Sequence, residues 1–486
     1  MRRWFTPSPI TLLLDAETQG LYNTNMIFRP KSILLAVALI GAVGCDTMYR
    51  AQVAQEEVAT MSSDAGGDVA AQTEFVDLTR FTLPEYVMFA LTNRPDVISA
   101  RLAVSNACLK LTQITSGEYP ILGVSGGYSQ STHNNGPHFS WHQSGDANAS
   151  FRLELLLYDF GRLDAQELEA RENIIAAQRD YADIQLAVFE DVATTYFTLL
   201  RNDALLAVAC TNEQQYAAHL HQAESLFDAG EVKNLDVLKA RLDLSDAHLK
   251  TITASNDVET ASAEFIRALG LKADVAERLD VLPPRPDSLG KPRRELPMTR
   301  QCASDALVSA RTNAPSLMVL RAKVRAASAR VDYAVADLLP SLSLDAGFSY
   351  VDPVWNFSWG VNAVQSLFEG YRKTSAVDAA VVEMQRARED VFLAEQKLSC
   401  SLSQAVATRD TARQALENAR VQVRQARENL DNVVAQYRVG EASRIDFTDA
   451  ASAFSGAEGA RIKAFYAGQI AEAVLVRLTG VGVEYE

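Results

Sequence analysis

Phe227-Asp228-Ala229-Gly230-Glu231, running on to Leu235-Asp236, is the stretch that decides the fold, because it occurs twice. The second copy is Tyr437-Arg438-Val439-Gly440-Glu441, running on to Ile445-Asp446, at a constant offset of 210 residues. In each copy a glycine interrupts a long helical pattern, and glycine ends helices because it enters the left-handed region without penalty. Helical periodicity resumes within a few residues, so each copy is predicted to be the tip of a helical hairpin.

The helical patterns on either side of these tips are unusually long. The first runs from about residue 162 to 228 without Pro or Gly, which corresponds to about 100 Å of helix. Its partner runs from about 235 to 269, and the second hairpin runs from about 371 to 480. Apolar residues recur every seven positions at Ile175, Ala182, Phe189 and Tyr196. Heptad spacing of this kind predicts helices that pack side by side along their length.

Two other stretches alternate with a period of two and predict β-hairpins. The first has strands at about 120–130 and 147–158, separated by a Gly/Asn/Pro-rich loop over 131–146. The second has strands at about 340–350 and 355–367, where Trp355, Phe357 and Trp359 oppose Asn356 and Ser358. One apolar face and one polar face are typical of a membrane barrel, with Trp at the lipid interface. A soluble sandwich is disfavoured, because four short strands cannot bury both hairpins.

The chain therefore divides into two repeats. Asn93-x-Pro95 returns as Asn313-x-Pro315, so we predict a first repeat over 81–270, a Pro-rich linker over 271–300 and a second repeat over 301–480. Residues 481–486 form a C-terminal tail. Four strands cannot close a barrel, and open sheet edges are not tolerated in lipid. The barrel must therefore be shared between several chains.

The N-terminal region is predicted to target the protein. Residues 32–44 are continuously apolar, too short to span a bilayer as a helix, and follow basic residues. Residues 1–44 therefore indicate a signal sequence, with Met26 as a possible true start. Gly44-Cys45 resembles a bacterial lipobox, which predicts a covalent lipid on Cys45 followed by a tether over 45–80. An ordinary signal peptide with an incidental cysteine is the alternative, and the effect of Asp46 on sorting stays open.

Composition and motifs exclude several functional classes. A net charge of −15 over 486 residues disfavours a nucleic-acid partner, which needs clustered Lys and Arg. The G-x-S-x-G match over residues 123–127 lies in an alternating strand rather than at a strand-to-helix elbow, which disfavours an enzyme. His133, His138 and His142 match no standard metal spacing, so no metal site or other cofactor is expected. Four isolated cysteines are expected to be buried free thiols, with one disulfide left open: Cys108, Cys210, Cys302 and Cys400.

Several of these features together resemble the TolC-type outer-membrane efflux family, in its OprM-like lipoprotein branch. The resemblance covers about residues 80–480. It rests on the Asn-x-Pro pairs, the Leu157-Tyr158-Asp159-Phe160-Gly161-Arg162 corner, the two Gly tips and the Asp446/Asp449 pair. The second corner, over residues 367–372, departs by placing its Gly one residue earlier. The resemblance implies an α+β membrane protein: a homotrimer with a 12-stranded β-barrel in the outer membrane, continued by an α-helical barrel in the periplasm.

The function implied is a passive exit channel coupled to a periplasmic adaptor and an inner-membrane transporter. Multidrug or small-molecule efflux is favoured; type I protein secretion is the alternative, and a structural scaffold is the alternative from a different class. Gly230 and Gly440 are predicted adaptor-docking tips, unless they are turn residues only. Asp446 and Asp449 share a helix face and are predicted to form the channel gate, unless they only cap the helix. The sequence identifies neither the substrate nor the particular pump.

Overall fold

The computed structural model describes residues 82–134, 141–230, 233–271, 303–351, 354–438 and 441–480. All of them belong to one unit of the chain, residues 75–486, which is separate from residues 1–74. The predictions for the signal sequence, Met26, Cys45, the tether, the linker beyond residue 271, Cys302, His138, Gly440 and the C-terminal tail therefore lie outside the described residues.

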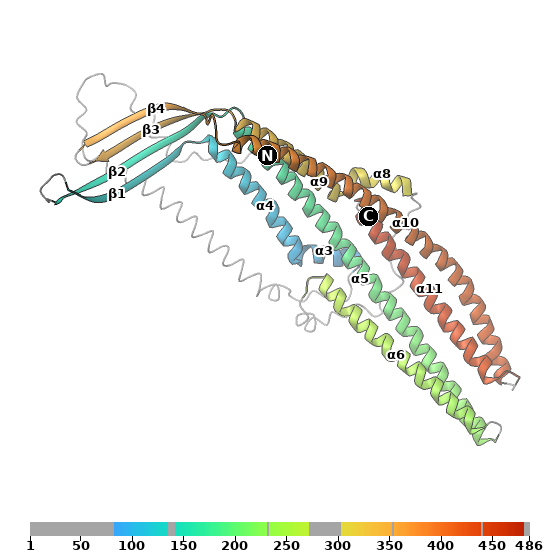
Figure 1. Ribbon diagram of the computed structural model, residues 1–486. Helices are drawn as coiled ribbons and strands as arrows, with labels where there is room; N and C mark the ends of the chain where they lie inside the picture. Colours follow the sequence, from blue (N-terminus) through green and yellow to red (C-terminus); the bar gives the residue numbers. More distant parts are fainter. Residues whose placement is uncertain are drawn as a thin grey trace, which may run out of the picture. The chain divides into compact units, whose positions relative to one another are not determined.

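The described elements fall into two series with the same order (Figure 1). The first series contains α3 (Leu83–Asn93), α4 (Pro95–Thr115), the short 3-10 helix η2 (Ser116–Glu118), β1 (Ile121–Asn134), β2 (Trp141–Tyr158), α5 (Arg162–Asp228) and α6 (Asn234–Ala268). The second contains α8 (Ala303–Asn313), α9 (Pro315–Ala336), β3 (Ser341–Val351), β4 (Val354–Val364), α10 (Arg372–Arg438) and α11 (Arg444–Thr479). The two helices that follow the strand hairpins, α5 and α10, have 67 residues each. At about 1.5 Å per residue, each carries the chain about 100 Å from the strands to a tip.

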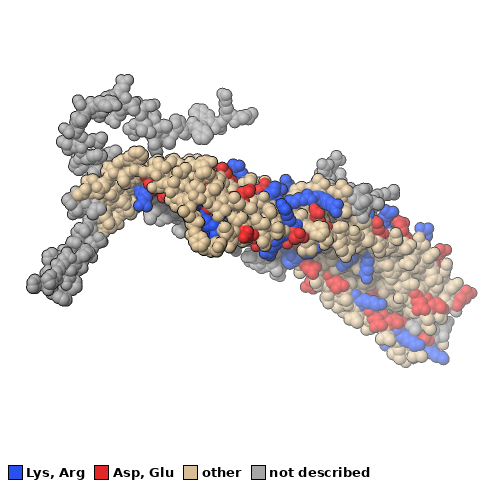
Figure 2. All heavy atoms as spheres, turned by 45° about the horizontal axis from the view of Figure 1, so that its top comes forward, with Lys and Arg blue, Asp and Glu red and all other residues tan. Residues whose placement is uncertain are grey.

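The strands form one antiparallel sheet in the order β1-β2-β3-β4, with a distinct character on each face. Registered neighbours across the four strands form an apolar row: Val124, Phe151, Phe348 and Phe357. The next row lies on the opposite face and is polar: Ser125, Ser150, Ser349 and Asn356. Among the described residues no other element covers the apolar row, since the side chain of Phe357 is 62% exposed. Figure 2 shows most Lys, Arg, Asp and Glu over the helices and few over the sheet. An uncovered apolar face is what a lipid-facing sheet requires.

The first β-hairpin corrects the sequence interpretation of its loop. A loop was predicted over residues 131–146, but β1 continues to Asn134 and β2 already begins at Trp141, with His133 paired to His142. The ladder is made by backbone groups, so it continues through polar and small residues that carry no hydropathy signal. At the other hairpin, β4 ends at Val364 rather than near residue 367. There the Gln365 side chain turns away and donates to the Leu338 carbonyl at 3.3 Å.

The corners between strands and long helices are built alike despite their different glycine positions. Phe160 and Gly161 have φ of 58° and 86°, and Gly370 and Tyr371 have φ of 61° and 67°. Two successive left-handed residues therefore stand at equivalent places, and the displaced glycine leaves the turn unchanged. Each corner holds one aromatic in a conformation that costs about 1–2 kcal/mol for a residue with a Cβ. In the first corner, the Asp159 carboxylate offsets part of this cost by accepting from the Leu163 amide at 2.7 Å.

The long helices pack in the order α6, α5, α11, α10, each contacting the next. The largest apolar cluster joins α3, the middle of α5 and the end of α6, where the Tyr86 and Phe265 rings meet edge to face at 5.1 Å. A second cluster joins α8, α9, α10 and α11 around Leu402 and Leu317. The short helices also join the two repeats, because α9 packs on α5 of the first repeat, where Val319 and Ala322 meet Ala176.

The Asn-x-Pro motifs lie where each helical hairpin returns to its short helices. Gly480, which ends α11 with φ of 67°, lies so close to Asn313 that a Cβ would stand 2.5 Å from the Asn313 carbonyl oxygen. Gly270, at the end of α6, has φ of 79°, and a Cβ there would stand 2.9 Å from the Arg94 side chain and 3.2 Å from its Cα. The contact at Gly480 is the stricter one, because a positive φ and a very close backbone atom coincide there.

We expect Gly480→Ala to destabilise the protein by about 2 kcal/mol or more, because the new Cβ meets strain and a backbone atom at once. The midpoint of thermal unfolding of the purified protein would measure this. The matched control is Gly456→Ala, inside α11, where no atom stands within 4 Å of the added Cβ. The control should leave the midpoint unchanged or raise it, since Ala favours helix over Gly. Equal midpoints for the two variants would contradict the close-contact account.

Candidate functional site

The first hairpin tip exposes bare backbone. Gly230 has φ of 79°, and its amide donates to the Phe227 carbonyl at 2.9 Å, which closes the end of α5. No atom lies within 4 Å of the place where its Cβ would stand. The tip can therefore admit the backbone of another helix at close range. Gly440, its predicted equivalent, lies outside the described residues.

Exposed apolar side chains lie at the same tip and along the helix that leads away from it, and the sequence interpretation did not identify them. Phe227 is exposed at the end of α5, and four exposed leucines follow on α6: Leu235, Leu238, Leu242 and Leu249. Their spacing of three, four and seven residues places them on one helix face. That spacing was a signal available in the sequence. On the second hairpin, Ile445 is also exposed at the start of α11.

The second predicted site lies on the first turns of α11. Asp446 and Asp449 are both exposed, whereas Phe447 and Ala450 between and beside them are buried. The two carboxylates therefore share an outward face, as the spacing predicted. Asp446 also caps the helix: its Oδ2 accepts from the Ser443 amide at 2.8 Å, and its own amide donates to the Ser443 hydroxyl at 3.3 Å. A hydrogen bond from the Ser443 side chain to the Asp446 carboxylate, and second the one from the Ser443 amide, lower the pKa of Asp446.

An aromatic cluster fixes α11 behind these carboxylates. The His219 ring from α5 is buried and stacks on Phe447, with centroids 4.5 Å apart and planes within 13°. Tyr437, at the end of α10, approaches both rings, at 5.2 Å from His219 and 5.9 Å from Phe447. The cluster thus joins three long helices next to Asp446. Sequence reasoning missed it, because no local pattern predicts which residues meet across helices so far apart in the chain.

Asp449 is also electrostatically linked to α5. Burial raises the pKa of Tyr216, and the charges of Asp243 on α6 and Asp449 on α11 raise it further. The two predicted gate residues therefore differ in their surroundings. Asp446 is engaged by the helix cap, and Asp449 lies near a tyrosine of the neighbouring helix. Helix capping gives the Asp446 carboxylate a role within one chain, but it gives no role to the Asp449 carboxylate.

We expect Ser443→Ala to destabilise the start of α11 by about 1 kcal/mol, the usual effect of losing an N-cap. Because the folded pKa of Asp446 is lowered, its contribution is present above the ordinary Asp pKa and is lost as pH falls through the folded value. Ser443→Ala should therefore reduce that pH dependence, although the backbone amide of residue 443 still donates to the carboxylate. Hydrogen exchange of the amides in the first turn of α11, followed from pH 7 downward, would measure both effects. Ser452→Ala, on an exposed position of the same helix, is the control; equal protection in both variants would contradict the cap.

The structure also places the serine of the G-x-S-x-G match and the candidate metal ligands. Ser125 lies inside β1 with its hydroxyl 2.7 Å from that of Ser150, and not at an elbow. Among the described residues, no group of three His, Cys, Asp or Glu is placed to hold a metal ion.

The prediction that the cysteines are buried is wrong for Cys108 and Cys400, which are exposed free thiols. A single small residue carries too little hydropathy to decide which face of an amphipathic helix it occupies. In the part of the chain that is described, no helix combines the length and the hydropathy that a membrane span needs.

Comparison with known proteins identifies the fold and the family. The family described as outer membrane efflux protein matches residues 88–271 and 306–481, which are most of the two repeats. The chain is 25% identical over 344 residues to the outer membrane efflux protein BepC of Brucella suis, covering 68% of this chain and 71% of that one. It is 24% identical over 436 residues to the cation efflux system protein CusC of Escherichia coli, covering 85% and 88%.

Solved structures show the same fold at low identity. Crystal structures of CusC match with a TM-score of 0.73 at 19% identity, covering 85% of this chain and 94% of that one. The CmeC outer membrane channel of Campylobacter jejuni matches with a TM-score of 0.72 at 17% identity, covering 82% and 85%. The family match over both repeats and the shared fold agree. The chain belongs to the outer membrane efflux protein family, whose members are passive channels that need no cofactor and are not enzymes.

Proposed function

We propose that three copies of this chain form one channel that crosses the outer membrane and continues through the periplasm. The four-stranded sheet carries this proposal: its apolar face is uncovered, and β1 and β4 stand at its two edges. In lipid, such edges must pair, and known barrels of single bacterial chains have at least about eight strands. Three sheets joined edge to edge give a closed barrel of 12 strands. In it, β4 of one protomer pairs with β1 of the next.

The outer helices support the same assembly. In the order α6, α5, α11, α10, the helices α6 and α10 stand at the ends and each needs a neighbour. The four leucines on one face of α6, Leu235, Leu238, Leu242 and Leu249, are uncovered, and Leu235 is 56% exposed. On α10, Phe392 and Val421 are also exposed. Packing α6 against α10 of the next protomer would cover both faces and close a ring of helices.

In a cell, this channel would be the exit of a tripartite system, coupled to a periplasmic adaptor and an inner-membrane transporter. We infer small-molecule export as its task. The names of the relatives point to different cargoes, since CusC is a cation efflux protein and TtgI of Pseudomonas putida belongs to a toluene efflux pump. A passive channel receives its cargo from the transporter, which accounts for the different cargoes of these relatives. Protein secretion and a purely structural scaffold are the alternatives.

Lipid attachment at Cys45 is part of the proposal and rests on the Gly44-Cys45 junction. A relative from Salmonella typhimurium, SilC, is described as a probable outer membrane lipoprotein. Cys45→Ser should abolish labelling by a fatty-acid analogue, because no thiol remains at the new N-terminus. The matched control is Cys108→Ser, which removes an exposed thiol elsewhere. If Cys45→Ser is labelled as strongly as the control, the anchor lies elsewhere. Outer-membrane localisation by fractionation would test the sorting effect of Asp46.

Cross-linking between edge strands tests the shared barrel. Cysteines at Gly123 in β1 and at Ser358 in β4 would lie on the same, polar face of the sheet. With Cys108 and Cys400 replaced by Ser, oxidation or a short bifunctional reagent should give covalent dimers and trimers. If β4 and β1 of neighbouring protomers pair in a shifted register, the β4 cysteine can be moved to Asn356 or Gly360. The control pairs Ser358→Cys with Ser150→Cys on the central strand β2, which should give none. Covalent oligomers from the control pair, or no covalent oligomers from any edge pair, would contradict the proposed barrel.

A further inference from the structure

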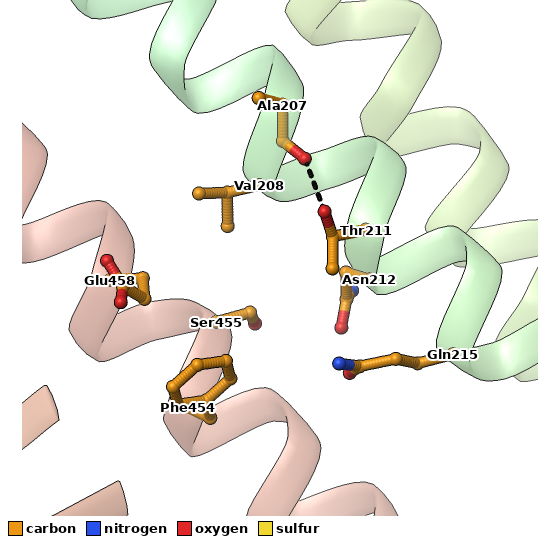
Figure 3. A pocket seen from close by; sticks show the side chains of 8 residues that line it. All are labelled: Ala207, Val208, Thr211, Asn212, Gln215, Phe454, Ser455 and Glu458. Carbon is orange, nitrogen blue, oxygen red and sulfur yellow. Dashed lines mark hydrogen bonds between the residues drawn. The ribbon is translucent and has the colours of Figure 1, made fainter. Parts of the chain in front are cut away.

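A cavity of about 240 Å³ lies between α5 and α11 (Figure 3). Its α5 wall includes Asn212 and Gln215, and its α11 wall includes Phe454 and Ser455. The sequence explains the hollow: α11 is built almost entirely of small residues from 450 to 460, among them Gly456 and Gly459. Small residues cannot fill the space opposite the longer side chains of α5. The cavity is smaller than a pocket for a drug-sized molecule, so it suits a compact ligand.

Asn212 is the unusual member of the lining. Its side chain is only 8% exposed, and its carboxamide oxygen is buried without a hydrogen-bond partner among the described residues. Figure 3 shows the carboxamides of Asn212 and Gln215 directed into the space that faces Ser455 and Phe454. A buried carbonyl oxygen without a donor is costly, and native proteins satisfy nearly all such groups. A ligand that donates a hydrogen bond would satisfy it.

The two hydroxyls in the wall can only accept from a ligand, whereas the Gln215 carboxamide offers both a donor and an acceptor. The Thr211 hydroxyl donates its proton to the Ala207 carbonyl at 2.9 Å, as the dashed line in Figure 3 shows. The Ser455 hydroxyl donates to the Ser452 carbonyl at 3.1 Å. Each hydroxyl has one proton, so only the oxygen lone pairs remain for a ligand.

The ionisable groups at the cavity disfavour an anion, while the one negative charge in the wall is already paired with an arginine. Glu458 is the one ionisable residue of its lining, and its carboxylate accepts from the Arg461 guanidinium at 3.0 Å. No Lys, Arg or His is part of the wall. The remaining surface is apolar and includes Val208 and the Phe454 ring. Acceptors at one part of the wall and apolar atoms at another fit an amphiphilic cation.

We propose that this cavity is a binding site for a small aliphatic amine in its ammonium form. The ammonium group has three donors and no acceptor. It reaches the Asn212 carboxamide oxygen and the Ser455 oxygen, while its alkyl chain packs against Val208 and Phe454. The site lies within one chain, so it depends on neither the trimer nor the export activity.

Ligand-observed NMR on the purified full-length protein in a non-ionic detergent would test this site. The probes are n-butylamine, 1-butanol and butyrate, which share an alkyl chain and differ in the polar group. At neutral pH the amine is an ammonium ion and should bind most tightly, because it alone combines several donors with a positive charge. The alcohol should bind more weakly, and the carboxylate should show no saturable binding.

Two substitutions at Asn212 should change amine binding in opposite directions. Asn212→Leu removes the acceptor and should weaken it about tenfold, the effect of one hydrogen bond to a charged group. Asn212→Asp adds a carboxylate and should tighten it. Ser455→Leu fills the cavity and should abolish binding, whereas Gly456→Ala, outside the lining, should change nothing. Butyrate binding as tight as the amine, or equal amine binding by the Leu and Asp variants, would overturn the proposal.

Discussion

Replacing Asp449 by alanine should increase the conductance of the channel and weaken its block by multivalent cations, with the yield of trimer unchanged. In the proposed trimer, threefold symmetry brings Asp446 and Asp449 of each protomer to one ring of six carboxylates. Crowded carboxylates raise one another's pKa and attract cations. Removing them should therefore widen the constriction and reduce the affinity for blocking ions.

Asp449 is the better single test, because Asp446 has a second role. The Asp446 carboxylate caps α11 through Ser443, so Asp446→Ala should also lower stability. The double variant should show the largest conductance, together with a lower melting temperature. Asp236→Ala is the matched control, since it removes the equivalent first-turn carboxylate from α6 in the other hairpin. If the double variant keeps wild-type conductance and block and only its melting temperature falls, the two residues are caps and not a gate.

Tryptophan at both hairpin tips, Gly230→Trp with Gly440→Trp, should abolish export while leaving the trimer assembled. The proposed adaptor reaches the backbone at these tips, and a large side chain would keep it away. At Gly230 no atom of the described residues beyond the chain neighbours lies within 4 Å of an added Cβ, so the side chain begins in open space. Survival of a strain lacking the native channel, challenged with a toxic substrate of the matching pump, would measure export.

A matched pair of alanine variants separates bulk from backbone strain. Gly230 has φ of 79°, so any side chain there costs backbone energy. Gly230→Ala with Gly440→Ala imposes the same strain but little bulk, and export should largely survive. Loss of export in the alanine pair would assign the effect to the turn itself. Full export in the tryptophan pair would place adaptor docking elsewhere, and the exposed Phe227 beside the tip would be the next residue to alter.

The long helices were the most predictable part of the fold. Residues 162–228 contain no Pro or Gly, and α5 spans Arg162–Asp228. The shared face of Asp446 and Asp449 followed from their spacing alone. The first strand hairpin was harder, because β1 and β2 continue through polar residues that carry no alternation in hydropathy.

Features that depend on contacts between distant segments could not be predicted. His219 stacks on Phe447 across more than 200 residues of chain, and nothing near either residue indicates that contact. The second corner looked different in sequence because its glycine is displaced. Its backbone is the same, because the turn sets the φ values and tolerates Tyr371 in the left-handed region. The hollow beside Asn212 depends on which face α11 presents to α5, which also follows only from the packing.

The most direct test of the proposed trimeric channel is the conductance of the purified protein in a planar lipid bilayer. The sample should first be shown by native mass spectrometry to contain three chains. We expect discrete single-channel steps that favour cations and are larger in the Asp446→Ala, Asp449→Ala variant. A trimer that inserts into the bilayer but gives no conductance in either form would contradict the channel and would leave a structural scaffold as its role.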